Sequence, residues 1–231
     1  MSLLALSLAP VILIIWFIYK RDKYEKEPGK VLILSVVFGA LTVIPVFFIE
    51  TWLAGYWENK FNYPSNKMLT AAYDAFVVAA FTEEAFKYLV FILFIWANKN
   101  FNEKFDGIIY ASFISLGFAA VENIMYVMSS GFGTGLIRAF TAVPAHAAFG
   151  ITMGYFLAWA KFRPNKRFLY MIWAIVIPIF LHGFYDFILM SQNNYLLLLF
   201  IPFLAFMVVI GFRQMKQLSN ISKFKPIVED E

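Results

Sequence analysis

The sequence contains no cysteine, which excludes disulfide bonds, thiolate nucleophiles and cysteine-ligated metal centres. Any metal would therefore need histidine and carboxylate ligands. Charge is also scarce, because only 15% of the 231 residues are Asp, Glu, Lys or Arg. The net charge of +4 comes from basic residues in short loops, and the chain carries no nucleic-acid-binding motif. We therefore expect no nucleic-acid partner.

The abundance of apolar residues predicts a lipid bilayer as the surroundings of this chain. Hydrophobic side chains make up 61% of the sequence and aromatic ones 20%, with a mean hydropathy of +0.71, far above the range of soluble domains. A helix needs about 20 apolar residues to cross the hydrocarbon. The sequence therefore predicts an all-α, polytopic membrane helix bundle of about seven transmembrane helices. The predicted spans are 2–19, 30–53, 71–97, 107–129, 136–160, 168–190 and 195–213.

These spans form a single predicted transmembrane domain over residues 1–213, followed by a cytoplasmic tail over residues 214–231. Fifteen of the nineteen Lys and Arg residues lie in the connections and the tail on one side, three lie on the other, and Lys87 lies within a span. Short cytoplasmic connections carry the excess of Lys and Arg in membrane proteins. We therefore predict an amino terminus outside the cell and a carboxyl terminus in the cytoplasm. Because the predicted number of spans is odd, the two termini must also lie on opposite sides of the membrane.

Two adjacent carboxylates and a lysine, Glu83, Glu84 and Lys87, lie inside the apolar span 71–97. Placing one ionised side chain at the centre of a bilayer costs about 2.5–3.5 kcal/mol, and such residues are usually functional. A self-neutralising group that locks two helices together is the structural alternative. Because Glu83 and Glu84 are adjacent, they point about 100° apart on a helix. We expect one to act chemically and the other to pair with Lys87 or a neighbouring helix, and the spacing leaves open which.

Three more spans carry polar side chains: Glu122 and Asn123, then His146, then His182 and Asp186. Both histidines of the chain therefore lie within spans. At a rise of about 1.5 Å per residue, these groups and Glu83 lie within about two helical turns of one another in height. Each of these groups could also have a purely structural role. A histidine could bond to a carbonyl that Pro144 frees, and the other groups could make polar contacts between helices. Taken together, they predict one polar pocket in the outer half of the membrane.

Hydrolysis by a water that a glutamate activates is the chemistry that fits these residues. A carboxylate held away from bulk water can serve as general base, and a His-Asp pair four residues apart shares one helix face and can hold an oxyanion. A metal-dependent variant stays open, in which Glu83, Glu122, His146 and His182 bind Zn²⁺, although the His-Glu-x-x-His signature is missing. The competing class is a proton-coupled transporter or channel, disfavoured because the inner halves of the spans hold few polar groups.

Four stretches of the chain resemble the PrsW family of bacterial intramembrane proteases: 81–87, 117–126, 144–155 and 181–189. The resemblance extends to the loop 24–28 and so covers nearly the whole chain. It implies a multi-pass protease of the bacterial inner membrane, embedded in the lipid bilayer. Its implied partner is a membrane-anchored anti-sigma factor, in which the protease makes the first (site-1) cut near the outer surface.

The chain is more distantly similar to the CAAX prenyl endopeptidase and bacteriocin-processing superfamily. That pattern matches Glu83 to the glutamate that activates water, and His182 with Asp186 to the pair on the oxyanion side. Two residues depart from it: Lys87 stands one residue before the expected arginine, and Glu122 stands where a histidine is expected. We therefore expect these roles: Glu83 as general base, Glu84 and Lys87 orienting it, Glu122 and His146 completing water or metal binding, and His182 with Asp186 stabilising the oxyanion.

Overall fold

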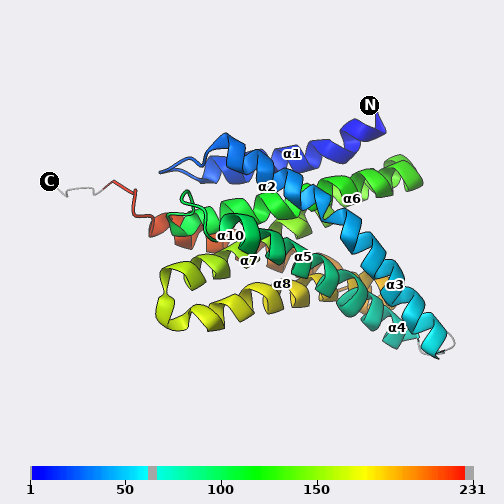
Figure 1. Cartoon of the computed structure of the whole chain (residues 1–231). Helices are drawn as coiled ribbons and strands as arrows, with labels where there is room; N and C mark the ends of the chain where they lie inside the picture. The colour runs from blue at the N-terminus through cyan, green and yellow to red at the C-terminus, as the bar shows by residue number, and fades with distance from the viewer. Residues whose placement is uncertain (1, 62–66, 227–231) are drawn as a thin grey trace.

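The computed structural model describes residues 2–61 and 67–226, and within these residues the regular structure is entirely helical (Figure 1). The predicted all-α class is confirmed. The elements are α1 (Leu3–Arg21), α2 (Gly29–Leu41), α3 (Val43–Phe61), α4 (Lys67–Tyr73), the π-helix η1 (Asp74–Phe81), α5 (Thr82–Val90), the π-helix η2 (Phe91–Ile95), α6 (Lys104–Phe140), α7 (Ala142–Phe162), the short 3₁₀ helix η3 (Pro164–Lys166), α8 (Arg167–Met190), α9 (Asn194–Leu197) and α10 (Phe200–Asn220).

Five helical stretches of residues 2–61 and 67–226 are long and apolar enough to cross a membrane, so the predicted count of about seven is too high by this measure. One of them, Lys104–Phe162, contains two predicted spans, because the chain bends at Gly131 and turns at Thr141 without a separate loop. The predicted span 71–97 is not among the five. It is divided among α4, η1, α5 and η2, and it carries the charged cluster around Glu83.

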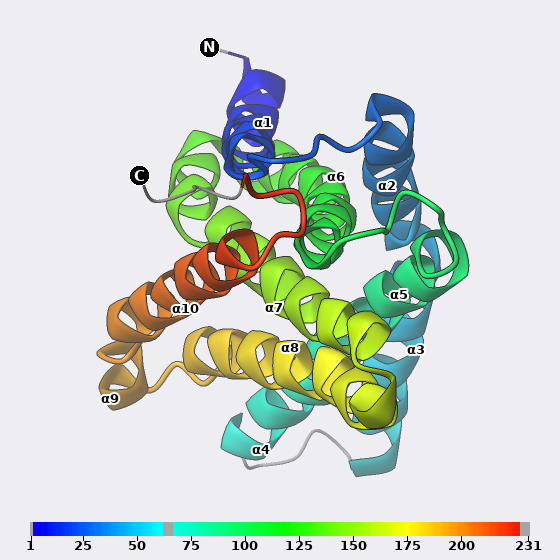
Figure 2. The ribbon, with the colours of Figure 1, turned by 90° about the vertical axis from the view of Figure 1, so that its left-hand side faces the viewer.

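The first half of α6 is the centre of the bundle. Every residue from 105 to 119 is buried, as expected for a helix that is apolar around most of its surface. Glycines let its neighbours approach closely: a Cβ added at Gly154 of α7 would lie 2.1 Å from the carbonyl oxygen of Gly107, and one at Gly117 would lie 2.1 Å from that of Val36 on α2. Figure 2 shows α1 and α2 on one side of α6 and α7, with α8 and α10 on the other.

The connections fall into two groups at opposite ends of the bundle. The α1–α2 connection, the entry to α6, the α7–α8 turn and the end of α10 lie together at the left of Figure 1, and the start of α1, the end of α3 and the α8–α9 turn lie at the right. The left-hand group contains the connections in which basic residues are concentrated. The predicted topology assigns the left-hand connections to the cytoplasmic face of the membrane and the right-hand connections to the outer face.

Helix α10 continues to Asn220, seven residues beyond the predicted last span. Met215 and Leu218 are buried, and the side chain of Gln214 accepts a hydrogen bond of 3.2 Å from Thr152 of α7. The first residues of the predicted tail therefore pack on the bundle. Residues 227–231 of that tail lie outside the described residues, and the domain assignment stays a prediction.

Candidate active site

Glu83, Glu84 and Lys87 lie on α5, in the helical turns that directly follow the π-helix η1. Segments of π-helix occur frequently at functional sites. The lysine is three and four residues beyond the glutamates, so all three side chains share one side of the helix. Its Nζ is 2.9 Å from Glu83 Oε2 and 2.8 Å from Glu84 Oε1. Lys87 therefore pairs with both carboxylates, where the spacing alone had suggested one.

The two glutamates differ in how accessible their unpaired oxygen is. The Glu84 side chain is completely buried; its Oε1 contacts both Lys87 and His182 Nδ1, the latter at 3.1 Å, and its Oε2 has no partner among the described residues and no exposed surface. The Glu83 side chain is 7% exposed, and its Oε1 accepts no hydrogen bond from the described residues. That oxygen lies 4.0 Å from His182 Nε2. Glu83 thus keeps one carboxylate oxygen available to a further group.

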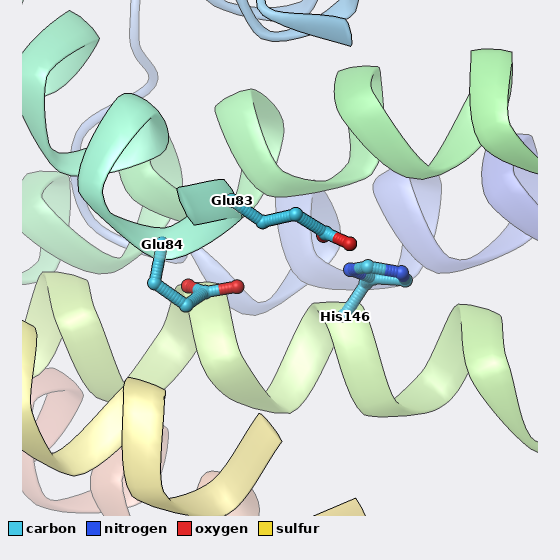
Figure 3. Close-up of side chains that lie close together, drawn as sticks. All are labelled: Glu83, Glu84 and His146. Atoms are coloured by element: carbon cyan, nitrogen blue, oxygen red, sulfur yellow. The ribbon is translucent and has the colours of Figure 1, made fainter. Parts of the chain in front are cut away.

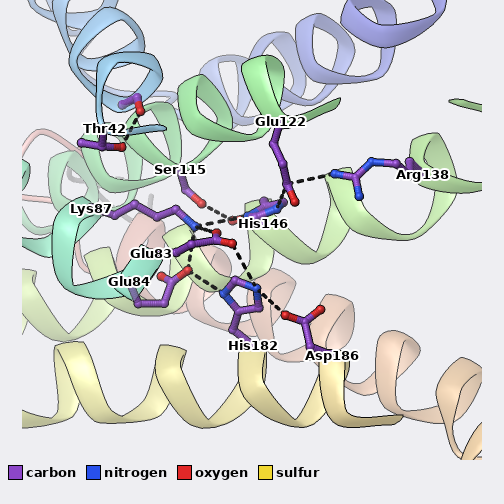
Figure 4. Close-up of polar contacts among 11 residues, drawn as sticks. Thr42, Glu83, Glu84, Lys87, Ser115, Glu122, Arg138, His146, His182 and Asp186 are labelled. Carbon is purple, nitrogen blue, oxygen red and sulfur yellow. Dashed lines mark hydrogen bonds and ion pairs between the residues drawn. The ribbon is translucent and has the colours of Figure 1, made fainter. Parts of the chain in front are cut away.

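His182 of α8 is held between two carboxylates (Figure 4). Its Nδ1 lies 3.1 Å from Glu84 Oε1, and its Nε2 lies 3.1 Å from Asp186 Oδ2 one turn along the same helix. Ionised carboxylates only accept hydrogen bonds, so both ring nitrogens donate and the ring is an imidazolium. The ring also stacks on Phe149 of α7, with 4.7 Å between the ring centroids. These contacts fix both the charge and the orientation of His182.

His146 of α7 joins the cluster from the opposite side. Its Nε2 is 2.8 Å from Glu122 Oε2 of α6, and its Nδ1 is 3.3 Å from Lys87 Nζ. Because an ammonium group only donates, Nδ1 accepts and the ring carries its proton on Nε2. The ring therefore contacts side chains rather than a carbonyl freed by Pro144. Its own backbone carbonyl accepts a hydrogen bond of 2.7 Å from Ser115.

The predicted convergence of four helical segments is present in the structure. The side chains of α5, α6, α7 and α8 meet in one network, drawn in Figure 4. Backbone and side chain together, each of four residues of the network is at most 5% exposed: Glu83, Glu84, His146 and His182. The network shields these groups from lipid and pairs most of their charge, which explains how they are tolerated within a membrane.

Arg138 belongs to this network and was missed by the sequence reasoning, which placed it outside the membrane. A guanidinium nitrogen of Arg138 lies 2.9 Å from Glu122 Oε2, and its Nε donates to Asn123 Oδ1 at 2.8 Å. Gly131, whose φ of 83° is favourable only for glycine, bends α6 so that Arg138 returns toward Glu122. Glu50 of α3 is a further glutamate within a predicted span that the sequence reasoning did not single out.

Comparison with known proteins identifies the family. The sequence model of the PrsW family, described as "PrsW family intramembrane metalloprotease", matches residues 27–212. The chain belongs to this family. It is similar to Protease PrsW of Oceanobacillus iheyensis, with 36% identity over 217 residues that cover 94% of this chain and 96% of that protein. Protease PrsW of Clostridioides difficile is 35% identical over 229 residues, covering 96% and 94%, and that of Bacillus subtilis is 31% identical over 222 residues, covering 96% and 97%.

No solved structure matches this chain. Membership of the PrsW family makes the chain a multi-pass, membrane-embedded protease, so the transporter alternative is set aside. It also makes the network of Figure 4 the candidate catalytic centre of a PrsW protease, since it is the buried polar cluster that lies within the apolar part of the bundle.

The description of the PrsW family implies a metal, and three side chains form a candidate group for one. Glu83, Glu84 and His146 each offer one ligand atom, and these atoms lie within 4.8 Å of one another (Figure 3). Glu122 and His182, two of the predicted ligands, are not part of this group. Carboxylate oxygens and imidazole nitrogens are ligands that zinc accepts, at about 2.0–2.2 Å.

The position of Lys87 conflicts with a metal at this place. Its ammonium group lies 2.8 to 3.3 Å from each of the same three side chains. A metal and an ammonium group compete for the same lone pairs, and the two positive charges repel one another. The arrangement is therefore built around a lysine and does not fit a metal unless Lys87 moves away.

Proposed function

We propose that this PrsW protease hydrolyses a peptide bond of its substrate with a water molecule that Glu83 activates. The supporting observation is the free Glu83 Oε1, 4.0 Å from Nε2 of the His182 imidazolium. Two groups at this separation can both lie about 3 Å from one reacting atom, as a base and an oxyanion donor must. Glu84 has no comparable access because its side chain is completely buried.

In the proposed reaction Glu83 takes a proton from the water as its oxygen adds to the carbonyl carbon of the substrate. The carbonyl oxygen gains negative charge, which the imidazolium of His182 stabilises as its Nε2–H, otherwise directed at Asp186, turns to donate to that oxygen. Glu83 then returns the proton to the leaving nitrogen as the carbon–nitrogen bond breaks. Asp186 keeps His182 protonated and oriented, through the 3.1 Å contact between them.

The remaining residues of the network act as positioning residues in this proposal. Lys87 holds Glu83 Oε2 at 2.9 Å, which turns the other oxygen of that carboxylate toward His182. Nδ1 of His146 contacts the Lys87 ammonium group, and Nε2 of the same ring contacts Glu122, which fixes the ring in place. These contacts join side chains from three helices, α5, α6 and α7, so the base is held rigidly. Rigid placement of reacting groups is itself a source of rate enhancement.

The proposed substrate is a membrane-anchored protein of the anti-sigma factor type, and the proposed reaction is its first cleavage. Membership of the PrsW family supports this assignment. We also propose the bacterial inner membrane as the location, with the amino terminus outside and the carboxyl terminus in the cytoplasm. The separation of basic connections to one end of the bundle supports this orientation.

The experiment that tests this proposal co-expresses the chain with a tagged single-span anti-sigma factor in bacterial cells and maps the new terminus by mass spectrometry. We expect a cut near the outer membrane face with the wild type and none with Glu83→Gln. The matched control is Glu58→Gln, an exposed glutamate on α3, which should cleave normally. Cleavage by Glu83→Gln at the wild-type rate would rule out the proposed base.

A further inference from the structure

A second group of buried acidic side chains lies far from the active site, where the α1–α2 connection meets the start of α6. One carboxylate oxygen from each of Glu25, Glu27 and Asp106 lies within 4.8 Å of the other two. Asn102 donates to Glu25 at 3.1 Å, and Tyr110 donates to Glu27, so the connection is packed directly against α6. Figures 1 and 2 both show this connection beside the first turns of α6.

This group is separate from the catalytic network. Asp106 precedes Glu122 by 16 positions on α6, which corresponds to about 24 Å along the helix axis. The bend at Gly131 comes after both residues, so this part of the helix is regular. The mechanism proposed above uses none of these carboxylates.

Two aspartates of this region are buried with oxygens that lack partners. Asp106 is 0% exposed; its Oδ2 accepts hydrogen bonds from the backbone N–H groups of Asn102 and Glu103, but its Oδ1 accepts none from the described residues. Asp22 is also 0% exposed, and neither of its oxygens has a partner among those residues. Asp22 is near enough to Asp106 and Glu25 for their negative charges to raise its pKa. Leaving a buried charged acceptor without a partner is costly, so these oxygens call for a bound cation or for protons shared among the carboxyl groups, as between Glu27 and Asp106.

The lysine closest in sequence does not supply that charge. The Lys26 ammonium group donates to the backbone carbonyl oxygens of Tyr19 and Asp22, and it lies 4.4 Å from the centre of the Tyr19 ring. Its charge acts on Asp22, but only from beyond the distance of an ion pair. Within residues 2–61 and 67–226, none of the clustered carboxylates forms an ion pair with a basic side chain. Burial raises the pKa of Asp22 to about 7, and the charge of Lys26 offsets only part of this rise.

We propose that Glu25, Glu27 and Asp106, with Asp22 beside them, bind one hard divalent cation, Ca²⁺ or Mg²⁺. Both ions prefer carboxylate and carbonyl oxygens, and the group offers oxygen ligands alone. Oxygens on opposite sides of a Ca²⁺ ion are about 4.6–5.2 Å apart, and those on a Mg²⁺ ion about 4.0–4.2 Å. Oxygens within 4.8 Å of one another therefore suit Ca²⁺ directly and Mg²⁺ after a small contraction.

The consequence of this site is a link between two parts of the chain that are distant in sequence. Glu25 and Glu27 lie in the connection between α1 and α2, and Asp106 lies in the first turn of α6. A cation shared by them ties both amino-terminal helices to the central helix. Because it binds the folded chain and not the unfolded one, it raises the temperature of unfolding. Glu25 is only partly buried, which gives the ion a route from solvent.

The experiment uses the full chain, purified in detergent, freed of metals with a chelator and dialysed. Calorimetric titration with CaCl₂ and with MgCl₂ should reveal one saturable site for at least one of the two ions, and that ion should raise the unfolding temperature by several degrees. Asp22→Asn and Glu25→Gln should weaken binding by about tenfold or more, because each removes a negative charge from the ion's surroundings. Comparison of the two salts identifies which ion the site prefers.

Two controls separate this site from other acidic groups. Glu58→Gln removes an exposed carboxylate on α3, and Glu84→Gln removes one from the active site; both should bind the ion as the wild type does. Binding that persists in Asp22→Asn and Glu25→Gln overturns the proposal. So does the absence of saturable binding for both salts. A rise in unfolding temperature in Asp22→Asn without any dependence on either ion overturns it as well, because the carboxylates would then be sharing protons instead.

Discussion

The side chains of Lys87 and His146 are 59 residues apart in sequence, yet their nitrogens Nζ and Nδ1 lie 3.3 Å apart. This contact links α5 to α7, and through Glu122 and Arg138 it continues to both arms of the bent helix α6. One buried ammonium group thereby serves acceptors on two helices. Lys87 therefore connects α5 to α7 within the catalytic centre, a contact that its place in the sequence beside the two glutamates does not reveal.

Replacing Lys87 with methionine should both destabilise the protein and abolish cleavage. Two buried carboxylates would lose their shared cation, and breaking a buried ion pair by removing one partner costs about 3–5 kcal/mol. The measurement is the midpoint of denaturant-induced unfolding in detergent. In the double variant Glu83→Gln/Lys87→Met the carboxylate whose closest ion pair is with Lys87 is neutralised, so part of the stability should return. A Lys87→Met variant as stable as the wild type would contradict the assigned pairing.

Arg138 should act on the reaction through Glu122. A hydrogen bond to a charged group contributes about 1.5–3 kcal/mol, so Arg138→Gln should lower kcat by about 10- to 100-fold. Because Arg138 is not expected to touch the substrate, KM should stay near its wild-type value. Arg138→Lys restores a cation and should recover most of the activity. The control is Arg213→Gln, an exposed position on α10, and an equal loss in that variant would refute a specific role for Arg138.

Much of the candidate site could be predicted from the sequence, because ionisable groups are too costly in a membrane to occur without partners. Four ionisable residues could be recognised because they interrupt apolar spans: Glu83, Glu122, His146 and His182. Their similar heights along the helices were enough to predict that they meet. The family resemblance rested on the same residues, and the comparisons confirm it.

Other features depend on backbone geometry that apolar patterns do not encode. The bend at Gly131 lies inside an apolar stretch, and it alone brings Arg138 back to Glu122. The π-helical segments η1 and η2 divide the expected span 71–97, since hydropathy does not distinguish π from α hydrogen bonding. Likewise, the spacing of Glu83 and Glu84 left open which one acts as the base, and the proposal of Glu83 rests on its partial exposure beside the complete burial of Glu84, which only the folded structure provides.

Glycines at the helix contacts should tolerate no side chain. A Cβ at Gly117 or at Gly154 would lie 2.1 Å from a backbone oxygen of the neighbouring helix. Backbone atoms do not move aside cheaply, so Gly117→Ala and Gly154→Ala should each destabilise the protein by about 1–3 kcal/mol. Gly55→Ala is the control, because nothing lies within 4 Å of its added Cβ. Unfolding midpoints that do not separate Gly55→Ala from the other two would count against this helix packing.

The proposed orientation can be tested by chemical labelling, since the chain has no cysteine of its own. Two exposed positions suit single cysteines: Ser130, beside the bend of α6, and Lys166, in the turn between α7 and α8. In Figure 1 the labelled far end of α6 and the α7–α8 turn lie at opposite ends of the bundle. A maleimide that does not cross membranes should label Ser130→Cys in intact cells. It should label Lys166→Cys only after the membrane is permeabilised. The reverse pattern would place the basic connections outside and invert the proposed topology.

The position of Lys87 predicts that hydrolysis needs no transition metal. Active protein, purified without added metal, should contain no stoichiometric zinc or iron by elemental analysis, and a transition-metal chelator should leave cleavage unchanged. Calcium or magnesium bound at the second acidic group is expected to be present in the same analysis. Stoichiometric zinc that disappears in Glu83→Gln together with activity would show that the metal displaces Lys87.

The most direct test of Glu83 as the base is single-turnover cleavage by purified protein in proteoliposomes, with the purified membrane-anchored substrate in the same bilayer. Glu83→Gln keeps the shape of the side chain and its contact with Lys87, but it does not accept a proton. We predict that this variant folds with nearly wild-type stability and cleaves at least about 100-fold more slowly. Cleavage at the wild-type rate by a folded Glu83→Gln protein would contradict the account.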